Sequence, residues 1–168
     1  MMQRRAFLAL ALPVALAACG ADNIWASDES LRRAAYVSNE PPSITLLTVI
    51  GIPKGEGAHS ALMINGSQRV IFDPAGSWNH PSIPERHDVL YGITPNFKNF
   101  YIDSHARQTS WLAEDTRLVP REVADAAIRA AQAQGATNKS FCAVSTGQVL
   151  GRVPGFEGAP SGFSPLKL

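Results

Sequence analysis

Three apolar segments, separated by turn-forming residues, follow one another in the first half of the chain. Residues 44–50 are rich in β-branched side chains and predict a buried strand. Further strands are predicted over residues 58–64 and 69–72. Asn65 and Gly66 lie between them, and both tolerate the positive φ angles of a tight hairpin turn. This half of the chain is therefore constrained to a meander of adjacent antiparallel strands.

The second half of the chain predicts short strands first and helices after them. One helix begins at Pro120, which suits a first turn, and ends before Gly135. A second helix is predicted from about Ser140 to Leu150. The predicted short strands are residues 88–91, 100–102 and 118–119. We therefore expect an α+β domain, in which a small antiparallel sheet packs against two C-terminal helices.

The N-terminal residues predict an export signal. Arg4 and Arg5 precede an apolar run over residues 6–18, which is too short for a comfortable membrane span. The run ends in Leu-Ala-Ala-Cys-Gly, which resembles the lipobox of bacterial lipoproteins. The resemblance implies cleavage before Cys19 and a lipid on that cysteine. Multiple acyl chains hold a protein firmly at a membrane, so we expect an anchored protein of the bacterial cell envelope, on the outer membrane or the periplasmic face of the inner membrane.

Composition argues against some classes of partner for the part of the chain that follows the predicted signal peptide. Loss of Arg4 and Arg5 with the leader changes the formal net charge from +1 to −1, which argues against nucleic acid as a partner. No P-loop or Rossmann glycine pattern is present, so we expect no cofactor. The expected organisation is a signal peptide over residues 1–18, a tether over 19–42, a folded domain over 43–152 and an irregular tail over 153–168.

Cysteine usage singles out one residue. The chain has two cysteines, and if Cys19 carries the lipid, Cys142 remains as an unpaired thiol in an oxidising compartment. At the start of the last predicted helix, Cys142 would lie where the helix dipole and free N–H groups favour a thiolate. His59, at the start of the second predicted strand, is the candidate base.

Asp73 is the candidate third residue, and the hairpin register decides whether it can help. A three-residue loop over residues 65–67 would place Asp73 opposite His59, on the same face of the sheet. A two-residue loop would place Phe72 there and send Asp73 to the other face. The sequence leaves both registers open.

Each of these residues also has a structural interpretation. A lone cysteine such as Cys142 is often a small buried apolar residue, and His59 could be a hydrogen-bonded histidine at a loop edge. Asp73 precedes a proline and could simply form a turn. The other histidines, at positions 80, 87 and 105, do not have the close spacing of common zinc sites, so we expect no metal.

The order of the candidate residues resembles the circularly permuted branch of the NlpC-type papain-like superfamily. In that branch the histidine comes first and the cysteine last, as His59 and Cys142 do here. The resemblance spans residues 43–152. It implies a permuted papain-like fold, with Cys142 as nucleophile, His59 as general base and a polar third residue.

This sequence departs from the branch in one place. Many members have an asparagine directly before the cysteine, whereas here Phe141 holds that place and the asparagine is Asn138. The third residue could also be Asn79 or His80 instead of Asp73, or be missing. The implied function is a cysteine peptidase, amidase or acyltransferase that acts on peptidoglycan peptides or an acyl substrate. The alternative is a non-catalytic lipoprotein that uses the same fold to bind an envelope partner.

Overall fold

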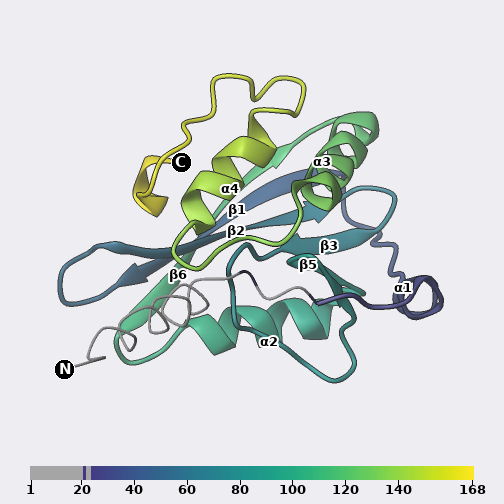
Figure 1. Cartoon of the computed structure of the whole chain (residues 1–168), viewed down its shortest axis with the longest axis horizontal. Helices are drawn as coiled ribbons and strands as arrows, with labels where there is room; N and C mark the ends of the chain where they lie inside the picture. The colour runs from purple at the N-terminus through teal and green to yellow at the C-terminus, as the bar shows by residue number, and fades with distance from the viewer. Residues whose placement is uncertain (1–20, 22–23) are drawn as a thin grey trace, which may run out of the picture.

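A computed structural model describes residue 21 and residues 24–168 (Figure 1). The predicted signal peptide and Cys19, the predicted site of lipidation, lie outside the described residues. Within the described part of the chain, no helix is long and apolar enough to cross a membrane.

The centre of the fold is one six-stranded sheet in which all neighbouring strands are antiparallel. The long central strand β1 pairs along its whole length with β6 on one side, and its residues 43–50 pair with β2 on the other. In sheet order the strands are β4 (Glu85–Arg86), β5 (Val89–Tyr91), β3 (Arg69–Phe72), β2 (Gly57–Asn65), β1 (Ser43–Gly51) and β6 (Ser110–Leu118). The predicted meander is confirmed in β1, β2 and β3.

Helices cover both faces of this sheet (Figure 1). Helices α3 (Arg121–Gln134) and α4 (Cys142–Leu150) pack on one face, where Leu62 and Ile64 of β2 point. Helix α2 (Pro95–His105) packs on the other face against side chains such as Met63. The α+β class and the two C-terminal helices on an antiparallel sheet are thus confirmed.

The local signals of α3 agree with its ends to within one residue, whereas α4 begins two residues later than predicted and has no side-chain cap. Pro120 stands directly before α3, and Gly135 ends the helix with a φ of 76°. The small side chains on one face of α3 let the helix approach the sheet closely. These buried residues are Ala124, Ala127, Ala130 and Ala131.

Two predictions for the middle of the chain are wrong. Residues 100–102, predicted as a strand, lie inside α2, because Thr94 caps the helix through the Phe97 N–H and Pro95 occupies its first turn. The strand predicted at 118–119 is only the end of β6, which starts at Ser110. Strand β6 is an edge strand with many polar, exposed side chains, so it lacks the apolar run that marks a buried strand.

The segment expected as a tether lies against the domain in its described part. It contains the short helix α1 (Asp28–Ala34), and the backbone N–H of Ala26 donates to the carbonyl of Glu85 in β4. Closer to β1, the Asn65 side chain donates to the carbonyl oxygens of Glu40 and Pro41. Residues 24–42 are thereby held along the edge and one end of the sheet.

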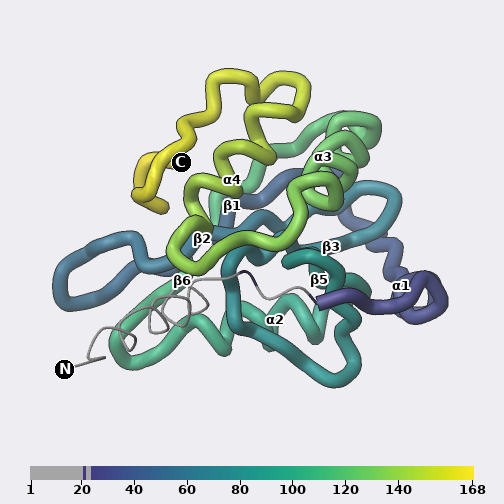
Figure 2. Tube along the Cα trace, in the orientation of Figure 1, coloured from purple at the N-terminus to yellow at the C-terminus, as the bar shows by residue number. Residues whose placement is uncertain are grey.

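The C-terminal tail also returns to the domain (Figure 2). It passes α4 so closely that a Cβ atom at Gly147 would lie 2.2 Å from the carbonyl oxygen of Pro160. It ends in a short 3-10 helix, η2 (Pro165–Lys167), which lies against Gly57 at the start of β2. The absence of a side chain at Gly147 is therefore what allows the tail to cover α4.

Two glycines of the α4 region provide a matched test of this contact. We expect Gly147→Ala to lower the free energy of unfolding by about 1–2 kcal/mol, because a contact with backbone puts the overpacking cost in the upper part of its range, at about 2–3 kcal/mol, against a gain of about 1 kcal/mol in helix propensity. Gly151→Ala should be neutral or stabilising, since its added Cβ would meet nothing closer than 3.4 Å. Urea unfolding of both variants measures the difference, and a Gly147→Ala protein as stable as Gly151→Ala would contradict the contact.

Candidate active site

Cys142 is the first residue of α4, and the residue is only 8% exposed. It is the one free thiol among the described residues. The chain reaches it through Ser140, whose φ is 71°, and through a turn in which the Phe141 N–H donates to the Asn138 carbonyl. The sharp turn sets the sulfur at the positive end of the helix, where N–H groups of the first turn have no partner within the helix.

His59 meets this thiol at a free edge of β2. Strand β3 pairs only with residues 62–65 of β2, so the beginning of β2 has no partner strand on that side. The start of α4 lies against this free edge, where the Ser60 N–H hydrogen-bonds the Cys142 sulfur and the His59 ring hydrogen-bonds it as well. The structure therefore brings the two candidate residues into direct contact.

Asp73 lies on the other side of the His59 ring. The His59 Nε2 donates to Asp73 Oδ1 over 2.6 Å, which leaves Nδ1 as the ring nitrogen for the thiol. The Asp73 side chain is almost fully buried, at 3% exposure. Cysteine, histidine and aspartate thus form a continuous chain of hydrogen bonds.

The hairpin register explains this contact, and it differs from both predicted registers. The loop has three residues, as one alternative proposed, but they are residues 66–68, and Asn65 pairs with Arg69. Continuing this register beyond Phe72 brings Asp73 opposite Ala61, two residues from His59 and on the same face. His59 and Asp73 are therefore diagonal neighbours rather than a directly opposed pair.

Two residues of α2 complete the site, and the sequence analysis identified neither role. The Tyr101 hydroxyl, fully buried, donates to Asp73 Oδ1 over 2.9 Å. One helical turn later, the His105 ring stacks parallel to the His59 ring with 6.0 Å between centroids. Nδ1 of His105 donates to the Tyr101 carbonyl over 2.8 Å, which fixes the ring orientation. The four-residue spacing of Tyr101 and His105 was the available signal, but residues 100–102 were predicted to form a strand.

A second carboxylate, Asp88, ties the two halves of the site together. Its Oδ2 accepts from the Thr137 N–H at 2.7 Å, in the loop that leads to Cys142. The same oxygen accepts from the Ala75 N–H at 3.2 Å, in the turn that follows Asp73. Burial raises the pKa of Asp88, although these N–H groups favour its ionised form. Asp88 therefore positions the nucleophile loop relative to the turn after Asp73.

The electrostatics favour charge separation between Cys142 and His59. Burial opposes a charged ring, yet the Asp73 hydrogen bond, the Cys142 hydrogen bond and both negative charges raise the pKa of His59 to about 10. Burial also opposes a thiolate, but the hydrogen bond and charge of His59, with the N–H groups of Ser60 and Ala143, lower the pKa of Cys142. Burial and the Asp73 carboxylate raise the pKa of Tyr101 well above its usual value, so its hydroxyl remains a donor.

The other residues considered from the sequence lie outside this chain of hydrogen bonds. Asn79 donates to the Ser77 carbonyl, and His80 accepts from the Ser82 N–H, so neither holds His59. Asn138 contributes a backbone carbonyl to the turn before Cys142. Within the part of the chain that the structure describes, no group of three potential ligands could hold a metal ion.

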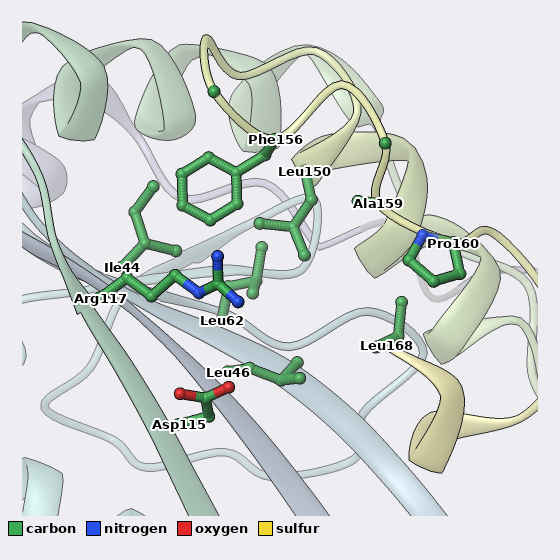
Figure 3. Close-up of a pocket in the computed structure, with 12 residues that line it drawn as sticks. Ile44, Leu46, Leu62, Asp115, Arg117, Leu150, Phe156, Ala159, Pro160 and Leu168 are labelled. Carbon is green, nitrogen blue, oxygen red and sulfur yellow. The ribbon is translucent and has the colours of Figure 1, made fainter.

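A pocket of about 260 Å³ lies away from this site, between the sheet and the C-terminal segment (Figure 3). Phe156 and Leu150 border it, and the Arg117 guanidinium lies 5.9 Å from the centre of the Phe156 ring. Leu150 is the last residue of α4 and Cys142 the first, so the two are about 12 Å apart along the helix. This pocket therefore does not face the thiol.

Comparison with protein-family models, with curated proteins and with solved structures gives no match to this chain. Any function of the site must therefore be argued from its own geometry.

The role of Asp73 can be measured through the thiol. Asp73→Asn removes the negative charge beside His59, so the pKa of the ring should fall from about 10 and that of Cys142 should rise. We expect the pH midpoint of Cys142 alkylation to move up by about 1–2 units. Asp103→Asn, which removes an exposed carboxylate of α2, is the matched control and should leave the midpoint unchanged. Equal midpoints in both variants would refute the coupling.

Proposed function

We propose that this protein is a cysteine hydrolase or acyltransferase that acts through Cys142 and His59. The observation that carries the proposal is the hydrogen-bonded chain from the Cys142 sulfur through the His59 ring to Asp73 Oδ1. Nucleophile, base and orienting group stand in the order that covalent catalysis requires. The position of the thiol at a helix start, beside a raised histidine pKa, adds a physical reason for an activated thiolate.

The proposed reaction has two halves. The Cys142 thiolate attacks the carbonyl carbon of an amide or ester, and the backbone N–H of Cys142 stabilises the oxyanion. The His59 imidazolium gives its proton to the leaving amine or alcohol as the C–N or C–O bond breaks, which leaves a thioester on the sulfur. Water or another acyl acceptor then attacks the thioester through its oxygen or nitrogen, and neutral His59 takes the proton of the attacking group. The bond from carbon to sulfur breaks and the Cys142 thiolate is released. Water gives a peptidase or amidase, and a different acceptor gives an acyltransferase.

The site also agrees with the resemblance to the permuted papain-like branch. The resemblance requires a histidine on a strand, a polar third residue on the next part of the meander and a cysteine at a later helix start. His59 in β2, Asp73 after β3 and Cys142 in α4 meet these requirements. Because no asparagine directly precedes Cys142, we assign the backbone N–H of Cys142 as the oxyanion donor.

We further propose that the enzyme works on the cell envelope, anchored through a lipid on Cys19. This part of the proposal is supported by the Leu-Ala-Ala-Cys-Gly sequence and the charged, apolar leader before it. Peptidoglycan stem peptides are then the default substrate by analogy with the resembled branch, and acyl esters are the second class to test.

Alkylation kinetics test the activated pair directly. In the full chain carrying Cys19→Ser, Cys142 is the only cysteine. An ordinary thiol with a pKa of about 8.5 is about 1% ionised two units below it. We therefore expect iodoacetamide to modify Cys142 at least about tenfold faster than a free thiol at that pH. His59→Ala should abolish this advantage, whereas His87→Asn, in the turn between β4 and β5, should keep it.

A mass-spectrometric trap separates the enzyme from the binding alternative. After brief incubation with peptidoglycan fragments or acyl esters, an enzyme should carry the acyl mass on Cys142, and Cys142→Ala should carry none. Slow alkylation of Cys142 at a rate that His59→Ala does not change, together with no acyl adduct, would overturn the proposed function. The binding lipoprotein would then be the remaining proposal.

A further inference from the structure

A second pocket, of about 360 Å³, lies beside the histidine of the candidate site. It is formed by the turn after Asp73, the end of α2 and the adjacent ends of β1 and β6. The lining includes Val49, Ser77, Trp78, Ser104, His105 and Arg107.

Three contacts connect this pocket to the candidate site. Val49 of β1 is the cross-strand partner of His59, so the floor of the pocket is the immediate neighbour of the base. His105 lines the pocket and stacks on the His59 ring. Trp78 lines it as well and contacts the ring of Tyr101 edge-on, with 5.3 Å between centroids. The pocket therefore adjoins the side of His59 on which Val49 and His105 lie.

The charge of the pocket is positive. Arg107 is the only residue with a permanent charge among the described residues that line it, and no carboxylate does so. The nearest acid along the chain, Asp103, is exposed on α2 and is not part of the lining. Arg107 and Trp78 together offer a cation and a flat apolar surface.

Several hydrogen-bond donors of the pocket are unused. The Arg107 Nε donates to the Ser104 carbonyl over 2.8 Å, which fixes the guanidinium at the end of α2. Its two Nη groups form no hydrogen bond with the described residues, and neither do Trp78 Nε1 and Ser77 Oγ. Capping of α2 thus accounts for only one of the Arg107 nitrogens. Guanidinium N–H groups arranged in this way suit a carboxylate, which can accept from two of them.

We propose that this pocket, the Arg107 subsite, binds a carboxylate on the part of the substrate next to the scissile carbonyl. The inference rests on the proposed function of Cys142 and His59 and names the substrate class: acyl compounds, such as peptides, with a free carboxylate close to the bond that is cleaved. The Arg107 guanidinium binds the carboxylate, and the Trp78 indole packs on the connecting atoms.

Matched thiol-reactive probes test the Arg107 subsite. Bromoacetylglycine and bromoacetylglycylglycine carry a carboxylate at two distances from the reactive carbon, and their C-terminal amides are neutral counterparts. In each case the Cys142 sulfur forms a bond to the methylene carbon and bromide leaves. In the full chain carrying Cys19→Ser, we expect the carboxylate probe of at least one length to react about threefold to fivefold faster than its amide.

Variants assign that preference to one residue. Arg107→Gln should bring the ratio of carboxylate to amide rates to about one, and Arg107→Lys should keep part of the preference because it keeps the charge. Arg129→Gln, an exposed arginine of α3 on the opposite face of the sheet, is the control with the same change in charge and should leave the ratio intact. In the protein that keeps Arg107, added salt should weaken the preference for the carboxylate probe. This measurement does not depend on whether an Arg107 variant folds.

The two proposals fail in distinguishable ways. Equal rates for acid and amide at both lengths, or a preference that survives Arg107→Gln, would overturn the subsite even if Cys142 reacts rapidly. The carboxylate preference could also depend on Arg107 while Cys142 reacts no faster than a free thiol with either probe. That result would support the subsite and overturn the activated pair.

Discussion

The short length of β3 is the constraint on which the candidate site depends. Because β3 ends at Phe72, the first half of β2 has an unpaired edge that faces the start of α4. A longer β3 would use the Ser60 N–H, which instead hydrogen-bonds the Cys142 sulfur. The chain turns at the same point, so Asp73 reaches back to His59 from the strand end. One interruption of a hydrogen-bonded ladder thus brings three distant parts of the sequence together.

Burial makes the pairing of these charges obligatory. A carboxylate or an imidazolium in an apolar interior is costly unless a partner and hydrogen bonds compensate for lost hydration. Asp73 receives hydrogen bonds from both His59 and Tyr101, and His59 has a carboxylate on one side and a thiol on the other. The charges of the site therefore stabilise each other as a set. Removal of one member should change the ionisation of the others more than it changes the fold.

Much of the fold was predictable because strong local signals agree with the tertiary structure. The apolar runs of β1 and β2 and the Pro120 and Gly135 boundaries of α3 are examples. Helix α2 was missed because its aromatic residues have strand-like propensity, while packing against the sheet and the Thr94 cap decide its conformation.

The candidate site was predictable only in part. Cys142 and His59 could be named from position and residue type, but the Asp73 contact depends on a register that the sequence left open. Asp88 acts through contacts between segments far apart in the chain, for which no local pattern exists. The helical spacing of Tyr101 and His105 was a local signal, but the strand predicted at residues 100–102 concealed it. The most direct test of the account is nitrogen NMR of the His59 ring as a function of pH. We predict an imidazolium that persists to a pH near 10 and loses this stability in Cys142→Ala and Asp73→Asn. An ordinary titration near 6.5, unchanged by either substitution, would contradict it.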